Sequence, residues 1–173
     1  MHIAILFSSK TGSTAAVAEA IREALKQEEI TYFGGHSLKL PEAELYFVSS
    51  WTDKGDACEE IREAFQKIKG KTLAYFSTAG FGGDDAYFQK VFERVRQSVD
   101  PSNEILDAWF CQGKMPAQVR ERHQLLLSRD PQNDRLKKSL QNFDAALSHP
   151  DETDLQNAAR WAQNVCRTAR KNP

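Results

Sequence analysis

The segment HIAILFSSKTGST, residues 2–14, contains the change of pattern that determines the expected fold. Residues 2–8 form a short apolar run without polar alternation in its middle, which is typical of a strand buried on both faces of a sheet. A turn-rich stretch follows, and residues 14–27 then place apolar side chains at helical spacing. The segment therefore predicts a buried strand, a loop and an amphipathic helix.

The alternation of strand and helix continues along the chain. Further strands are expected at residues 30–33, 44–50, 72–77 and 103–111, helices at 57–68 and 87–98, and loops at 51–56 and 78–85. Such alternation indicates a parallel sheet covered on both faces. The expected fold class is α/β, with a doubly wound, flavodoxin-like five-stranded parallel sheet in the order 2-1-3-4-5. In such a sheet a ligand lies beyond the carboxyl ends of the strands, where the strand order reverses.

The chain departs from this alternation after the fifth expected strand. Helices are expected at residues 117–128 and 134–147, before a closing helix at 154–169. A length of 173 residues fits one domain with one core, so residues 1–173 are expected to form a single domain. Residues 115–149 are then a helical insertion within it. Residues 112–149 carry seven basic residues against four acidic ones, so this segment is either a partner surface or an ordinary solvated pair of helices.

The first loop combines four hydroxyl side chains with one glycine. A helix N-terminus offers free N–H groups and a partial positive charge, and glycine allows a ligand to approach the backbone closely. Hydroxyl groups there add donors for a terminal phosphate. One hydroxyl would suffice for the alternative role of a helix cap. The loop therefore predicts a phosphate site formed by Ser9, Lys10, Thr11, Gly12, Ser13 and Thr14.

Two later loops have compositions that suit a flat ligand. In the second, Trp51 follows a strand and stands between polar neighbours, Ser50 and Thr52; the alternative is a tryptophan packed against the next helix. In the third, glycines allow close approach of a ligand to the backbone. The residues of the third loop expected at the site are Thr78, Ala79, Gly80, Phe81, Gly82 and Gly83.

The first strand, loop and helix resemble the phosphate-binding signature of flavodoxins. The matching residues are Ile5, Leu6, Phe7, Ser9, Gly12, Thr14, Ala18 and Ile21. This resemblance implies that the cofactor is flavin mononucleotide (FMN), with its phosphate on residues 9–14. It also implies that Trp51 lies on one face of the flavin ring and residues 78–83 at the other. Phe81 either covers that second face or folds into the core, and Tyr87 is the alternative cover. Flavodoxins typically present an acidic rim to basic partners, and the same is expected here.

A narrower similarity concerns the segment after the fifth strand. Residues 111–116, CQGKMP, followed by Arg120-Glu121-Arg122, are similar to the flavodoxin-like proteins associated with gut-bacterial bilirubin reductase. The match to ordinary flavodoxins covers roughly residues 1–114 and the last helix, because the usual insertion of long-chain flavodoxins interrupts the last strand rather than following it.

Other functional classes have little support. No apolar run reaches the ~18 residues of a membrane-spanning helix, and no signal peptide is evident, so a cytoplasmic protein is expected. A net charge of −1 does not suggest nucleic-acid binding. The four histidines and three cysteines lack metal-site spacing, so no metal is expected. The aspartates of a receiver domain are absent, because Ser8, Ser9, Ser49 and Ser50 occupy the corresponding strand ends.

The sequence thus predicts an FMN-binding, flavodoxin-like electron-transfer protein. Its expected partners are a reductase that supplies electrons and an enzyme that accepts them, and no residue is assigned a catalytic role. Two alternatives stay open. One is an FMN-dependent oxidoreductase that acts directly on a substrate beneath the basic helices, and the other is a flavin-free interaction domain.

Overall fold

The central element is a sheet of five parallel strands in the order β2-β1-β3-β5-β6. The computed structural model describes residues 1–35, 39, 41–82 and 85–171. The strands are β1 (His2–Phe7), β2 (Glu29–Gly34), β3 (Leu45–Asp53), β5 (Thr72–Ala79) and β6 (Glu104–Gln112). This confirms the doubly wound order 2-1-3-4-5, since the additional strand β4 (Asp56–Ala57) only pairs antiparallel with the end of β3.

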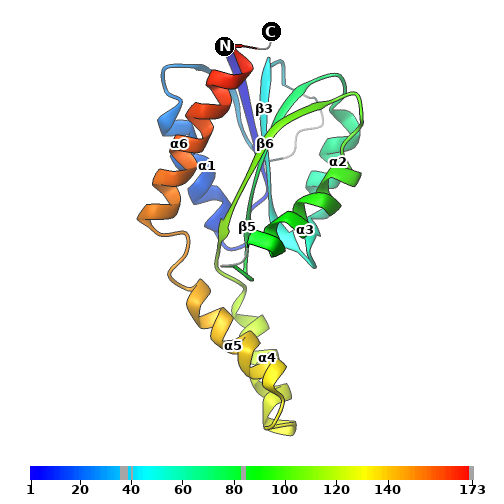
Figure 1. Cartoon of the computed structure of the whole chain (residues 1–173), viewed down its shortest axis with the longest axis vertical. Coiled ribbons are helices and arrows are strands. Elements are labelled where there is room, and N and C mark those ends of the chain that lie inside the picture. Colours follow the sequence, from blue (N-terminus) through cyan, green and yellow to red (C-terminus); the bar gives the residue numbers. More distant parts are fainter. Residues whose placement is uncertain (36–38, 40, 83–84, 172–173) are drawn as a thin grey trace.

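Helices cover both faces of the sheet (Figure 1). On one face lie α1 (Ser13–Ala24) and α6 (Glu152–Ala169), and on the other α2 (Glu59–Lys67) and α3 (Asp85–Gln97). Alternate residues of β1 belong to the two cores: Ile3 and Ile5 pack with α1 and α6, whereas Leu6 packs with α2 and α3. The uninterrupted apolar run of β1 is thus explained by burial on both faces.

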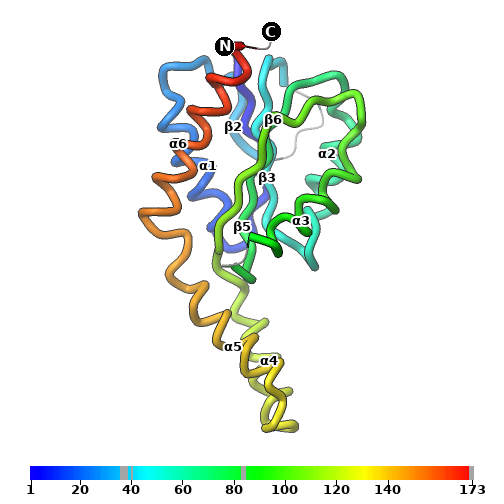
Figure 2. Tube along the Cα trace, in the orientation of Figure 1, coloured from blue at the N-terminus to red at the C-terminus, as the bar shows by residue number. Residues whose placement is uncertain are grey.

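Two helices after β6 form a hairpin that projects beyond the carboxyl end of the sheet (Figures 1 and 2). They are α4 (Ala117–Arg129) and α5 (Asp134–Ala146). No residue of α4 is buried, and α5 buries only Phe143 and Ala146. The expected helical insertion after the fifth strand is confirmed.

The prediction of a loop at residues 51–56 is wrong. β3 continues to Asp53, and the chain then turns through Lys54 and Gly55 into β4. Both turn residues have positive φ, 51° and 82°, as a two-residue hairpin turn of type I′ requires. The sequence did not indicate this part of the strand because its residues are mostly polar. They pair with the equally polar end of β5, where Ser50 is opposite Ser77 and Trp51 is opposite Thr78.

The third expected loop also begins later than predicted. Thr78 and Ala79 are the last residues of β5, and Asp85 already belongs to α3. Gly83 lies outside the described residues. Among the described helices, none combines the length and the apolar character that crossing a membrane requires.

Candidate functional site

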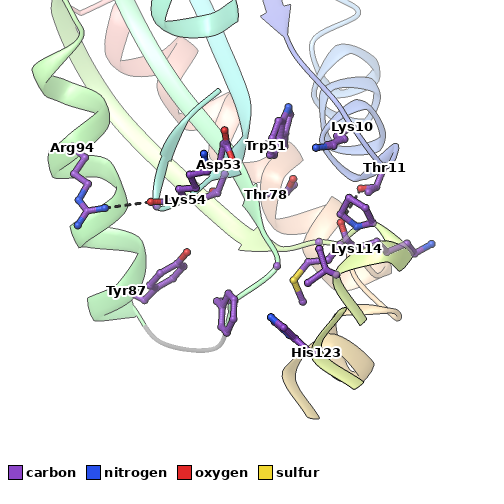
Figure 3. A pocket seen from close by; sticks show the side chains of 18 residues that line it. Lys10, Thr11, Trp51, Asp53, Lys54, Thr78, Tyr87, Arg94, Lys114 and His123 are labelled. Carbon is purple, nitrogen blue, oxygen red and sulfur yellow. Dashed lines mark hydrogen bonds between the residues drawn. The ribbon is translucent and has the colours of Figure 1, made fainter. Parts of the chain in front are cut away.

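A cavity of about 660 Å³ lies at the carboxyl ends of the strands (Figure 3). Each of the three expected loops contributes to its wall: the first through Lys10 and Thr11, the second through Trp51 and Thr52, and the third through Thr78, Gly80 and Phe81. The strand order brings these segments together because β1, β3 and β5 are neighbours in the sheet. The predicted convergence of the three loops is therefore observed.

The first loop presents free backbone donors. Within the described part of the chain, the N–H groups of residues 10–14 donate no hydrogen bond to any protein acceptor. Gly12 has φ +90° and immediately precedes α1, whose partial positive charge is therefore at this point. Five successive unpaired N–H groups at a helix N-terminus form a site suited to an anion.

The hydroxyl groups of this loop have protein partners. Ser9 Oγ accepts a hydrogen bond from the N–H of Ala15 at 3.1 Å, and Thr11 Oγ1 donates to the carbonyl of Lys114 at 2.8 Å. Ser13 Oγ accepts from the N–H of Lys114 at 2.9 Å. Because Ser9 and Ser13 act as acceptors in these contacts, each retains an O–H that is available to donate.

Thr14 has a different environment from the other hydroxyl residues. Its Oγ1 lies 2.8 Å from Oγ1 of Thr78, and both residues are buried. The two hydroxyls link the first loop to the end of β5. Thr14 therefore holds the loop in place. Of the six predicted phosphate-site residues, Lys10 and Thr11 line the cavity, whereas Ser9, Gly12, Ser13 and Thr14 do not.

Gly113 closes the first loop against the end of β6. A Cβ atom at this position would lie 2.9 Å from the Cβ atoms of both Ser13 and Thr78, so no side chain fits without displacement. The N–H of Gly113 also donates to the carbonyl of Ala79 at 2.9 Å. Gly113 was not predicted as a site residue, because its importance comes from two segments distant in sequence.

Trp51 lies between the cavity and the core. Its ring lines the cavity, and its body packs against the hydrophobic cluster beneath α2 and α3. The Nζ atom of Lys10 lies 4.5 Å from the centroid of the Trp51 ring. The two expectations for this tryptophan, a ligand contact and packing against the next helix, are thus both compatible with its position.

Phe81 and Tyr87 both line the cavity, with ring centroids 6.4 Å apart. Phe81 is 45% exposed, which is unusual for a phenylalanine and leaves its ring available for a ligand. Burial raises the pKa of the Tyr87 phenol, and the charge of Arg94 partly opposes this effect. The choice between the two rings as the cover of a flavin therefore stays open.

The third loop is attached to the helical hairpin. The carbonyl of Gly80 accepts hydrogen bonds from Asn142 Nδ2 at 2.7 Å and from Gln112 Nε2 at 3.0 Å. A Cβ atom on Gly80 would lie 2.1 Å from Cγ of Met115, and one on Gly82 would lie 2.7 Å from Cβ of Gln112. These glycines therefore allow residues 112–115 to pack directly on the loop.

Some predicted site residues lie behind the cavity wall rather than in it. Ser50 is fully buried, where its Oγ accepts from the N–H of Cys58 at 2.8 Å, and Ala79 is buried in β5. The wall also includes residues that the sequence did not predict. They come from the turn between β3 and β4, from α3, and from α4 with the segment that leads into it: Lys54, Gly55, Arg94, Met115, Pro116, Val119 and His123.

The charge around the cavity differs from expectation. The described residues that line it include four cations, Lys10, Lys54, Arg94 and Lys114, and one carboxylate, Asp53. The acidic rim expected from the flavodoxin resemblance is therefore wrong for the described residues. The cause is tertiary, because Arg94 and Lys54 come from α3 and the β3–β4 turn, whose proximity the sequence did not predict.

A model of the flavodoxin domain family matches residues 4–163 of this chain. The chain belongs to the flavodoxin family. Family membership implies a flavin-binding redox protein, in agreement with the free donors at the N-terminus of α1 and the aromatic wall of the cavity.

Two curated relatives carry the name flavodoxin-like domain-containing protein BilS. The one from Clostridium symbiosum (strain WAL-14163) is 36% identical over 173 aligned residues, covering 90% of each chain. The one from Clostridioides difficile (strain CD3) is 26% identical over 169 residues, covering 95% of this chain and 96% of the relative.

Solved flavodoxins share the fold at low sequence identity. Oxidised flavodoxin 2 from Bacillus cereus has a TM-score of 0.54 at 15% identity, covering 97% of this chain and 99% of that one. A WrbA-like flavodoxin from Agrobacterium tumefaciens has a TM-score of 0.56 at 12% identity, covering 99% of both chains. The flavodoxin-like fold is thereby confirmed.

Proposed function

We propose that this chain binds FMN in the cavity and passes electrons from a reductase to an acceptor enzyme. The observation that carries the proposal is the run of unpaired N–H groups at residues 10–14, at one end of a cavity lined by Trp51 and Phe81. A dianionic phosphate satisfies those donors, and an aromatic wall suits a flat ring.

Each part of the chain has a distinct role in this proposal. The backbone of residues 10–14 and the hydroxyls of Ser9 and Ser13 hold the phosphate. The ring, which supplies the one- and two-electron chemistry once it is bound, is held by Trp51, by Thr78 at the end of β5 and by the loop from Gly80 to Gly82. The protein contributes orientation and a local electric field. The cations around the cavity favour a negatively charged, reduced ring, because opposite charges attract.

The test separates the phosphate from the ring. Purified protein is titrated with FMN and with riboflavin, which has the same ring without the phosphate, and retention of flavin absorbance is followed through gel filtration. We expect FMN to bind much more tightly than riboflavin. A Thr11→Asp variant places a carboxylate beside the free N–H groups and should release FMN, whereas the neutral Thr11→Asn variant should retain it and riboflavin binding should be equal in both. Protein that retains neither flavin would contradict the proposal.

Electron transfer needs its own measurement. FMN-loaded protein is reduced with dithionite without oxygen, freed of excess dithionite by gel filtration, and mixed with cytochrome c as a one-electron acceptor. We expect oxidation of the flavin to accompany reduction of the cytochrome. A flavin that binds but does not exchange electrons would contradict a carrier role.

A second candidate function is an FMN-dependent reaction on a substrate in the same cavity. It is favoured by the wall that the helical hairpin adds to the cavity, since Val119 and His123 of α4 line it. The ring of His123 is held in place by a 2.9 Å hydrogen bond between its Nδ1 atom and Oγ of Ser139 on α5. A carrier needs no such wall. Reoxidation of the reduced protein by a small organic acceptor, with a rate that saturates as the acceptor concentration rises, would favour this second function.

A further inference from the structure

The turn between β3 and β4 holds a lysine in an unfavourable backbone conformation. Lys54 has φ +51°, and it is the one non-glycine residue with positive φ in the ranges that the structure describes. Asparagine, aspartate or glycine is preferred at this first position of a type I′ turn. A lysine here therefore costs stability, and such costs concentrate at functional positions.

Arg94 of α3 lies directly on the same turn. Its Nη1 atom donates to the carbonyl of Lys54 at 3.3 Å, and a Cβ atom on Gly55 would be 3.0 Å from that nitrogen. Gly55 thus leaves the space in which the guanidinium lies. Figure 3 shows Lys54 and Arg94 on one side of the cavity and Thr11 and Lys114 on the other, with Trp51 and Thr78 between them.

The charges of these two cations, Lys54 and Arg94, are not balanced by an ion pair within the part of the chain that the structure describes. Asp53 is the one carboxylate among the described residues that line the cavity. An FMN phosphate at residues 10–14 would lie at the opposite end of the cavity. The positive charge of Lys54 and Arg94 would therefore persist after FMN binds.

We propose that Lys54 and Arg94 bind the carboxylate of a second molecule, a small planar acid whose apolar body lies against Tyr87. Arginine and lysine are the usual partners of a carboxylate, and the ring of Tyr87 lines the same side of the cavity. A small molecule is favoured over an acidic protein segment because the two cations line a cavity whose walls are aromatic and apolar, rather than a flat surface. This proposal rests on the proposed function in one respect: the FMN phosphate is taken to occupy the other end of the cavity.

The probe is 2-naphthoate, with the neutral 2-naphthamide as its matched control. Both are titrated by calorimetry into the purified full-length protein, first without and then with saturating FMN. We expect 2-naphthoate to bind in both states and 2-naphthamide to bind about tenfold more weakly, because one charge-assisted contact is lost. If FMN does not bind at all, the proposed function fails, and the titration without FMN still tests Lys54 and Arg94.

The key variant is Lys54→Asn, which removes the ammonium and supplies the residue that the turn prefers. We expect its melting temperature to stay equal or rise while 2-naphthoate binding weakens about tenfold. Arg94→Gln should weaken binding similarly, and Lys90→Gln, on α3 but outside the residues that line the cavity, should leave it unchanged.

Three outcomes would overturn the proposal. The first is 2-naphthoate binding that is unchanged in Lys54→Asn and Arg94→Gln. The second is equal binding of the acid and the amide. The third is binding of an acidic Glu-rich peptide, lost in both variants, by a protein that does not bind 2-naphthoate, since that result would assign the two cations to a protein partner.

Discussion

The ammonium group of Lys10 lies 4.5 Å from the centroid of the Trp51 ring, and both residues line the cavity. A cation at this distance is attracted to the face of an indole. The contact joins the loop that offers free N–H groups to the residue expected to stack on a flavin. We expect the two residues to contact different parts of a ligand: Lys10 attracts its negative charge, and Trp51 stacks on its ring.

Replacement of these two residues should separate ring binding from phosphate binding. We expect Trp51→Ala to weaken binding of both FMN and riboflavin by roughly tenfold or more, because an aromatic contact and its buried area are lost. Lys10→Gln should weaken FMN binding alone, because riboflavin has no phosphate charge. Flavin fluorescence titrations measure both. Trp51→Phe should restore much of the affinity, and equal losses for both flavins in Lys10→Gln would contradict the assigned roles.

Substitution of Gly113 should disturb the junction between the first loop and β5. An added Cβ atom would meet the Cβ atoms of Ser13 and Thr78 at 2.9 Å, so we expect Gly113→Ala to lower the free energy of unfolding by about 1–3 kcal/mol. FMN affinity should fall as well, because Ser13 must move. Urea unfolding checks the first effect. Gly35→Ala is the control, since its nearest atom beyond the chain neighbours is 3.9 Å away; equal effects of the two substitutions would rule out this explanation.

Asn142 should couple the hairpin to the third loop. Its Nδ2 atom donates to the carbonyl of Gly80 at 2.7 Å, and a hydrogen bond of this kind contributes about 0.5–1.5 kcal/mol. We expect Asn142→Ala to speed amide hydrogen exchange in residues 80–82 and in α5 by up to roughly tenfold, with little change in α1. Asn157→Ala, an exposed asparagine on α6, is the matched control. Exchange that is unchanged around Gly80 would show that Gln112 alone holds the loop.

The three cysteines should take no part in the redox chemistry. Cys58, Cys111 and Cys166 are buried and free. Burial raises the pKa of the Cys111 thiol above its ordinary value, and raises that of Cys166 to about 11, so thiolate is scarce at neutral pH. We therefore expect slow reaction with Ellman's reagent in the native protein and complete reaction after unfolding in guanidinium.

A reactive thiol serves as the control for this prediction. Gln132 lies exposed in the turn between α4 and α5, so Gln132→Cys should add one rapidly reacting thiol to the native protein. Rapid reaction of the unmodified native protein would show that at least one of its own cysteines is accessible as thiolate, and thiol chemistry would then compete with the flavin as the carrier of electrons.

The sequence by itself determined the sheet and the first loop. An apolar run buried on both faces needs no long-range information to be recognised, and the spacing of Ser9, Gly12 and Thr14 after it is local. Helix N-termini present free N–H groups wherever they occur, so the free N–H groups on which the proposed phosphate site rests also follow from local order. The helical insertion was evident for the same reason, since helix periodicity and its breaks are properties of neighbouring residues.

Only the tertiary structure decided the walls and charge of the cavity. Strand pairing extended β3 through polar residues to Asp53, and the turn at Lys54 and Gly55 then came to lie beneath Arg94. The base of the hairpin added Met115 and His123 to the same cavity. These contacts join segments that are distant along the chain, and their energies depend on which side chains meet. For that reason the sequence predicted a flavin site with an acidic rim, whereas the fold surrounds the cavity mainly with cations.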